Sequence, residues 1–162
     1  MRKSVWEAVG GFPDSRAAED LIFMRRVEEA GFKIGWAPLA TAWWQLRPDL
    51  KSTFQKFVLY SKHNVWAGMQ RYWHYGIARQ YGAYLGALTL VVLHAAWWGL
   101  VPLLGFGART MKSIWVRREG RGLWWALNPV QFLGVAGLLL TIDIATLVGW
   151  LQAQRKPPAA TK

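Results

Sequence analysis

Two long apolar runs constrain this chain more than any other feature. Residues 82–107 carry no formal charge, and a helix of that length would extend roughly 39 Å at ~1.5 Å of rise per residue. The hydrocarbon core of a bilayer needs only about 20 residues to be crossed. The second run, residues 123–151, contains a single charge, Asp143. The sequence therefore predicts two membrane segments, neither of which has the features of a cleaved signal peptide.

The shape of the first run is left open by the sequence. A single crossing would place the soluble part and the C-terminal tail on one side of the membrane and the basic loop 108–122 on the other. A re-entrant hairpin that bends near Trp98-Gly99 or Pro102 would keep all the basic residues on one side. Each half of such a hairpin, about 13 residues, is too short to span alone. Counting basic residues does not separate the two topologies, and we favour the hairpin.

The formal charge of +11 is distributed in a way that argues against nucleic-acid binding. The expected loop between the apolar runs holds five basic residues, where such residues act as topology signals and bind lipid phosphates: Arg109, Lys112, Arg117, Arg118 and Arg121. We therefore expect membrane lipids, and no nucleic acid, as partners. The absence of cysteine excludes disulfides and thiolate zinc sites.

The first third of the chain has the character of a soluble protein. Residues 2–9 are predicted to form a helix that ends at Gly10-Gly11, because glycine pairs end helices. Asp14 or Ser15 is expected to cap a second helix that runs to about Ala30. Two short strands, 32–38 and 39–45, are expected next, divided at Pro38. This order of elements predicts an α+β fold for the soluble part.

This arrangement resembles the C-terminal half of the catalytic domain in family 2 glycosyltransferases, the inverting enzymes of the GT-A fold. The resemblance rests on motifs in a fixed order: Gly10-Gly11-Phe12, Glu19-Asp20, Arg26, Gly31 and "KIGWAP" at 33–38. It continues through 47–60 and, more loosely, through 141–152. It implies that residues 1–48 are the C-terminal portion of a GT-A-like domain.

The resemblance also implies roles for individual residues. Asp20 would be the general base that takes the proton from the acceptor hydroxyl, and Glu19 would make structural hydrogen bonds or touch the acceptor. Gly10 and Gly11 would let backbone amides approach a sugar. Two further candidates for substrate binding are Arg26, which we expect first as the partner of an acidic group, and Gln55. An alternative for the acidic pair is simple stabilisation of a helix N-terminus, worth ~0.3 to 1 kcal/mol.

The chain departs from the family at the donor site. The family's fold needs an Asp-x-Asp metal site, and the sequence contains none. The resemblance therefore implies an acceptor-side fragment, inactive alone. In the intact enzyme, Mg²⁺ or Mn²⁺ would hold a nucleotide sugar and the acceptor would be lipid-linked or a polysaccharide, at a bacterial inner membrane with the soluble part in the cytoplasm. The alternative is a non-catalytic integral membrane protein whose cap is an interaction or assembly module.

The remaining segments are expected to be helical or loop-like. Residues 49–81 should form amphipathic interface helices, 108–122 a basic loop and 152–162 a disordered tail. The apolar faces of the interface helices are formed by Leu50, Phe54, Phe57, Val58 and Val65, and by Met69, Tyr72, Trp73, Ile77 and Tyr81.

Asp143 is a separate candidate for a functional residue. Placing an ionisable group near the bilayer centre costs at least ~2.5 kcal/mol of free energy, so such a group is seldom present without a role. We expect it to hold helices together, with Thr89, His94 or Asn128 as its partner. The histidines His63, His74 and His94 lack metal-ligand spacing, which predicts structural or interfacial roles.

Overall fold

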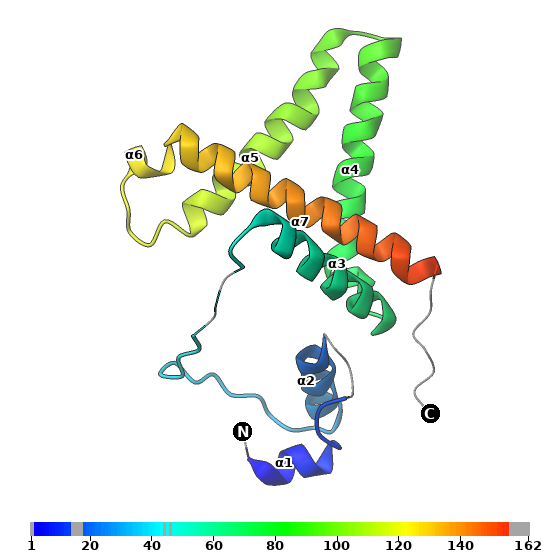
Figure 1. The fold of residues 1–162 in the computed structure, drawn as a ribbon, viewed down its shortest axis with the longest axis vertical. Coiled ribbons are helices and arrows are strands. Elements are labelled where there is room, and N and C mark those ends of the chain that lie inside the picture. The colour runs from blue at the N-terminus through cyan, green and yellow to red at the C-terminus, as the bar shows by residue number, and fades with distance from the viewer. Residues whose placement is uncertain (1, 14–17, 44, 46, 156–162) are drawn as a thin grey trace.

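The structure is a computed structural model that describes residues 2–13, 18–43, 45 and 47–155. Within these ranges every regular element is a helix and no strand occurs. The predicted α+β fold is therefore wrong, and the described chain is all-helical. Figure 1 shows a small pair of N-terminal helices below a group of longer helices, from which one helical hairpin projects.

The N-terminal pair, which we call the cap, consists of α1 (Lys3–Ala8) and α2 (Glu19–Glu29). Both helices expected here are present, and α2 is followed by Gly31 at φ +79, a left-handed conformation that glycine adopts without strain. The helix buries Phe23 and Val27. The proposed caps of this helix, Asp14 and Ser15, lie outside the described residues.

The two strands expected at 32–38 and 39–45 are not formed. The described residues between Phe32 and Pro48 are in turns or have no regular secondary structure, and their one backbone hydrogen bond in this stretch joins Ala40 N to Ala37 O at 3.0 Å. A strand is stable only when its backbone pairs with another, and an isolated pair of strands is marginal in water. Three large apolar side chains of this segment are 90–95% exposed: Trp36, Leu39 and Trp43.

Helix α3 (Leu50–Trp66) begins at Asp49, whose Oδ1 accepts a hydrogen bond from Ser52 N at 2.7 Å. The same bond lowers the pKa of the Asp49 carboxyl below its usual value. Helix α4 (Gln70–Leu93) follows after a turn at Gly68. The interface helices expected to end at residue 81 are thus correct in type, but the second continues into the first apolar run.

That apolar run reverses direction in its middle. After α4, a 3-10 turn (Ala96–Gly99) leads into α5 (Leu100–Val116), and the two helices form the projecting hairpin of Figure 1. The chain thus reverses direction within this run, at His94 and Ala95, a few residues before the Trp98-Gly99 position considered from sequence. A Cβ at Gly105 would lie 2.7 Å from the Tyr84 hydroxyl, so glycine here leaves room on α5 for the Tyr84 side chain of α4. The basic loop is shorter than expected, because α5 includes Arg109 and Lys112.

The second apolar run is divided between α6 (Leu123–Ala126) and α7 (Pro129–Arg155). Asn128 Oδ1 accepts a hydrogen bond from Val130 N at 2.9 Å, and Pro129 occupies the first helical position of α7. Helix α7 therefore starts at Pro129 and not at Leu123, where the apolar run begins. Helix α7 extends to Arg155, past the expected boundary at residue 151. The part of the tail beyond Arg155 lies outside the described residues.

Helix α7 is, in the described part of the chain, the one helix long and apolar enough to cross a membrane. Its most apolar window has a mean hydropathy of 2.0 and is only 22% buried, whereas the core helix of a soluble protein is mostly buried. Figure 1 shows α7 running across the base of the hairpin with α3 packed alongside it. The close approach of α3 and α7 occurs at Gly149, where an added Cβ would lie 2.5 Å from Val58 O.

Candidate functional site

The diglycine turn of the cap has a backbone conformation that favours glycine at both positions. Gly10 and Gly11 have φ values of 75° and 70°, and Gly11 N donates a hydrogen bond to Trp6 O at 2.9 Å. A Cβ on Gly11 would lie 2.7 Å from the Trp6 ring. The turn is tied to α2 because the Phe12 ring packs on Phe23 with 4.6 Å between ring centroids.

The acidic pair begins α2, with its two carboxylates in different surroundings. Asp20 is exposed, and its Oδ1 accepts a hydrogen bond from Leu21 N at 2.8 Å. Glu19 is half-buried, and its Oε2 has no hydrogen-bond partner among the described residues. Adjacent side chains on a helix point about 100° apart, which accounts for the difference. Asp20 is therefore the accessible carboxylate of the two.

The other two candidates from the sequence lie apart from this pair. Arg26 is exposed on α2, and within the described residues it has neither an ion pair nor a side-chain hydrogen bond, so the acidic partner expected for it is not seen. Gln55 is exposed on α3. The structure thus brings the diglycine turn together with α2, but it does not add Gln55 to that group.

No metal site is formed in the described ranges of the chain. No three His, Asp or Glu side chains there lie close enough together to hold a cation. The glycosyltransferase resemblance places the ligands of its divalent metal outside this chain. We derive no chemical step through a metal for this chain.

A buried polar cluster, which the sequence did not reveal, joins α3, α4 and α7. Ser61 Oγ lies 2.8 Å from His74 Nε2 and donates to Thr146 O at 2.6 Å, and all three residues are fully buried. Because the Ser61 hydrogen is used by Thr146, His74 must donate from Nε2 and carry a free lone pair on Nδ1, which has no partner in the described structure. The serine is neither accessible nor activated, so the cluster is structural. This agrees with the structural role expected for His74.

Acidification is expected to destabilise the fold through His74. Burial lowers the pKa of His74 below its ordinary value of 6.5, so the unfolded chain binds a proton that the folded chain does not. Stability should be complete above pH 6.5 and should fall as the pH drops below it, by at most ~1.4 kcal/mol per pH unit. Chemical unfolding measured from about pH 8 to about pH 5 tests this. His74→Gln should flatten the curve, whereas the exposed His94→Gln should leave its slope unchanged.

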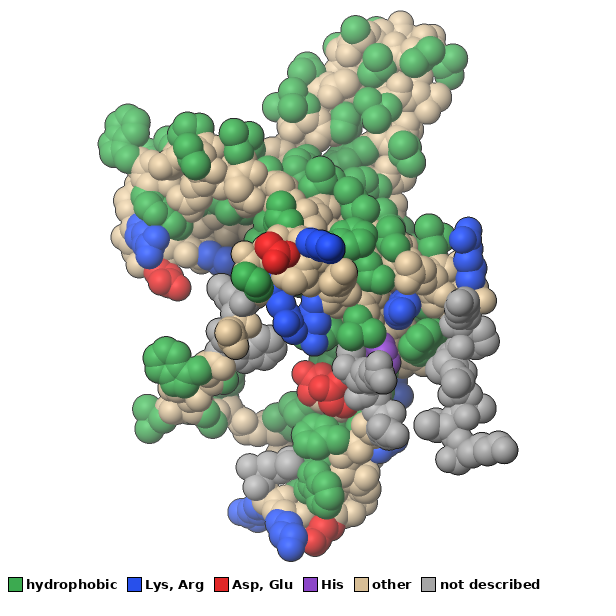
Figure 2. All heavy atoms as spheres, in the orientation of Figure 1, with side chains coloured by type: hydrophobic (Ala, Val, Ile, Leu, Met, Phe, Trp, Pro, Cys, Tyr) green, Lys and Arg blue, Asp and Glu red, His purple; other side chains and the backbone are tan. Residues whose placement is uncertain are grey.

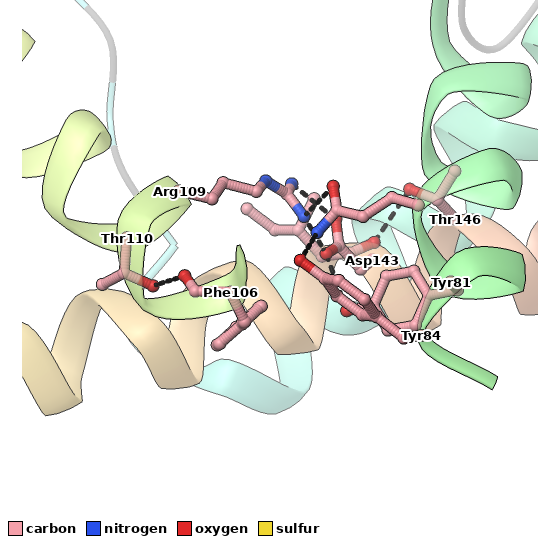
Figure 3. A network of polar contacts seen from close by, with 9 residues as sticks. Tyr81, Tyr84, Phe106, Arg109, Thr110, Asp143 and Thr146 are labelled. Atoms are coloured by element: carbon pink, nitrogen blue, oxygen red, sulfur yellow. Dashed lines mark hydrogen bonds and ion pairs between the residues drawn. The ribbon is translucent and has the colours of Figure 1, made fainter. Parts of the chain in front are cut away.

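Asp143 lies at the centre of a second buried cluster (Figure 3). Both of its oxygens accept hydrogen bonds from the Arg109 guanidinium, one of them at 2.8 Å from Nη2, and the Tyr81 hydroxyl donates to Oδ2 at 2.9 Å. Asp143 is fully buried, while the Arg109 side chain is 31% exposed. The cluster fastens both helices of the hairpin to α7.

The partners proposed for Asp143 from the sequence were wrong. Thr89 donates to Leu85 O, His94 contacts Trp98, and Asn128 begins α7. Arg109 was assigned to the basic loop, but α5 continues through it and directs it at α7. One feature of the sequence could have identified Arg109 as the partner of Asp143: it is the first charged residue after the apolar run 82–107.

No protein-family model, curated protein or solved structure matches this chain.

Proposed function

We propose that this chain is the acceptor-side part of a membrane-bound glycosyltransferase, which transfers a sugar with inversion from a nucleotide sugar. The observation that carries the proposal is the position of Asp20. Helix α2 packs Phe23 on Phe12, next to the diglycine turn, and keeps this carboxylate accessible in its first turn. The resemblance of residues 10–31 to family 2 enzymes supports the same role.

In this proposal Asp20 takes part in a single proton transfer. As the acceptor oxygen attacks the anomeric carbon, the carboxylate takes the hydroxyl proton while the bond to the nucleoside diphosphate breaks. The groups that bind the donor and stabilise the departing diphosphate belong, in this proposal, to a part of the enzyme outside this chain.

For the membrane we propose that α7 crosses the bilayer and that the hairpin lies along the headgroup boundary. Because α7 runs across the hairpin, only one of them can stand along the membrane normal, and α7 is the longer apolar helix. Figure 2 shows many hydrophobic side chains over the projecting hairpin, in agreement with the exposed apolar residues Leu85, Val92, Leu93, Trp97, Leu103 and Leu104. A bacterial inner membrane with the cap in the cytoplasm would give it access to nucleotide sugars.

The experiment for the catalytic proposal is loss of sugar transfer in Asp20→Asn. Membranes from cells that express the gene together with its upstream coding region are incubated with radiolabelled UDP- and GDP-sugars. Removing a general base should lower the transfer rate by about 10²- to 10⁴-fold. Glu29→Gln, a matched change of an exposed carboxylate on the same helix, should keep the rate. Undiminished transfer by Asp20→Asn would remove the catalytic role.

A second candidate function is an assembly module, and the exposed segment between α2 and α3 favours it. Trp36, Leu39 and Trp43 are 90%, 95% and 94% exposed, and apolar surface of this kind marks a site for another protein. Sequencing the DNA before Met1 separates the candidates. An upstream open frame with an Asp-x-Asp motif supports the enzyme, while a stop codon and a ribosome-binding site directly before Met1 support the module.

A further inference from the structure

The turn that joins α5 to α6 carries three arginines, which we call the basic turn: Arg117, Arg118 and Arg121. Glu119 is the one carboxylate within this turn. Among the described residues none of these four side chains forms an ion pair. Arg109 does not belong to the group, because its charge is already paired with Asp143. The basic turn therefore keeps a net positive charge that no group of the described chain neutralises.

The backbone and two tryptophans hold Arg118 and Arg121 in place. Arg121 N donates a hydrogen bond to Arg118 O at 2.9 Å, so the two residues close one tight turn. The Arg118 guanidinium lies 3.6 Å from the centroid of the Trp115 ring, and that of Arg121 lies 4.6 Å from the centroid of the Trp125 ring. A ring covers one face of a guanidinium and leaves the N–H donors in its plane available. Two positioned guanidinium groups are therefore ready to bind an oxyanion such as a phosphate.

Exposed apolar side chains flank the basic turn in the chain. They belong to the end of α5, to α6 and to the start of α7: Val116, Leu123, Trp124, Leu127 and Val130. Trp124 is 87% exposed. Figure 2 shows hydrophobic and basic side chains together at the end of the molecule where Figure 1 labels α6. Apolar surface beside cations matches the boundary of a bilayer, where lipid chains meet phosphate groups.

We propose that the basic turn binds the phosphate groups of anionic phospholipids, with Trp124 inserted at the headgroup boundary. Helix α7 begins at Pro129, a few residues later, so the turn lies at one end of the helix proposed to cross the bilayer. A soluble anion would use the arginines but would leave the apolar side chains in water, which is why we assign a lipid. This site rests on the proposed crossing by α7, and it is independent of the sugar transfer proposed for Asp20.

The test is native mass spectrometry of the full chain in neutral-detergent micelles, titrated with phosphatidylglycerol or with phosphatidylcholine of the same acyl chains. The first phosphatidylglycerol should bind about 25-fold more tightly than phosphatidylcholine, from roughly fivefold for each of two arginines. Arg118→Gln combined with Arg121→Gln should remove this preference and leave the affinity for phosphatidylcholine unchanged. Arg118→Lys combined with Arg121→Lys keeps both charges but not the planar groups held on the rings, so a smaller loss of roughly fivefold is expected.

The matched control is Arg25→Gln combined with Lys33→Gln, which removes two exposed charges from the other end of the chain and should keep the preference. An equal loss in this control would overturn the proposal, because net charge alone would then decide the affinity. Displacement of phosphatidylglycerol by a tenfold excess of glycerol 3-phosphate would also overturn it, in favour of a site for a free anion.

Reconstitution of the unchanged protein into nanodiscs of phosphatidylcholine alone tests the crossing by α7 separately. Entry into these discs without a preference for phosphatidylglycerol in the titration would overturn the lipid site and leave the crossing intact. Failure to enter them would overturn both. Neither result affects the proton transfer proposed for Asp20, which the sugar-transfer assay measures.

Discussion

Replacing Arg109 with leucine is expected to lower the free energy of unfolding by about 3–5 kcal/mol. The guanidinium bonds both oxygens of Asp143, which is fully buried, and its removal leaves that carboxylate with the Tyr81 hydroxyl alone. A buried charge without its partner is far more costly than the intact pair is stabilising. Equilibrium unfolding in mixed micelles, followed by circular dichroism, measures the loss.

Two companion variants separate the pair from the packing around it. Arg109→Lys keeps the charge but not the two parallel hydrogen bonds, so an intermediate loss is expected. The double variant Arg109→Leu with Asp143→Leu removes both charges and should recover most of the stability. If Arg109→Leu alone cost less than about 1 kcal/mol, the value of an exposed ion pair, Asp143 would not need this partner.

Gly149→Ala is expected to destabilise the protein by about 1–3 kcal/mol through overpacking. The added Cβ would lie 2.5 Å from Val58 O, 2.6 Å from Ser61 Cβ and 2.8 Å from Ser61 Oγ. The first of these is backbone, which cannot rotate away, so α3 and α7 must move apart. That movement would also stretch the hydrogen bond from Ser61 to Thr146. The same unfolding experiment measures the effect.

The control for this variant is Gly137→Ala on the same helix. A Cβ at Gly137 meets nothing within 4 Å, so the substitution should leave packing unchanged and stabilise the helix by up to about 1 kcal/mol. The two substitutions are therefore expected to change the free energy of unfolding in opposite directions. Equal effects at both positions would show that helix propensity, rather than the α3–α7 approach, decides the outcome.

Much of the helical structure could be predicted because its signals are local. The apolar spacing at 50–65 and at 69–81, and the glycine stops at 10–11 and 31, each act within one or two turns. Their helices are present with shifted ends. Arg109 and Lys112 show why the ends moved: basic residues mark a loop between membrane segments, but they are also good helix formers and continue α5.

The prediction of two strands was wrong because a strand depends on residues far away in the sequence. The segment with Trp36 and Trp43 has the composition of strands, but a strand requires a partner, which no local pattern supplies. The same limit applied to Asp143. The sequence showed that this carboxylate needs a partner, and only the return of α5 along the hairpin showed that the partner is Arg109.

The sequence by itself determined where most of the helices lie, that the second apolar run is apolar enough for a membrane, and that Gly10, Gly11 and Gly31 end helices, because these properties depend on neighbours a few residues away. It also predicted a membrane segment at 82–107, but that run is divided between α4 and α5, and α7 is the one described helix long and apolar enough to cross. The tertiary structure decided which polar groups meet inside: Arg109 with Asp143, and Ser61 with His74. It also exposed Asp20 while turning Glu19 inward. Those outcomes depend on how helices far apart in the chain cross, and one such crossing occurs at Gly149, where α7 lies close to the backbone of α3.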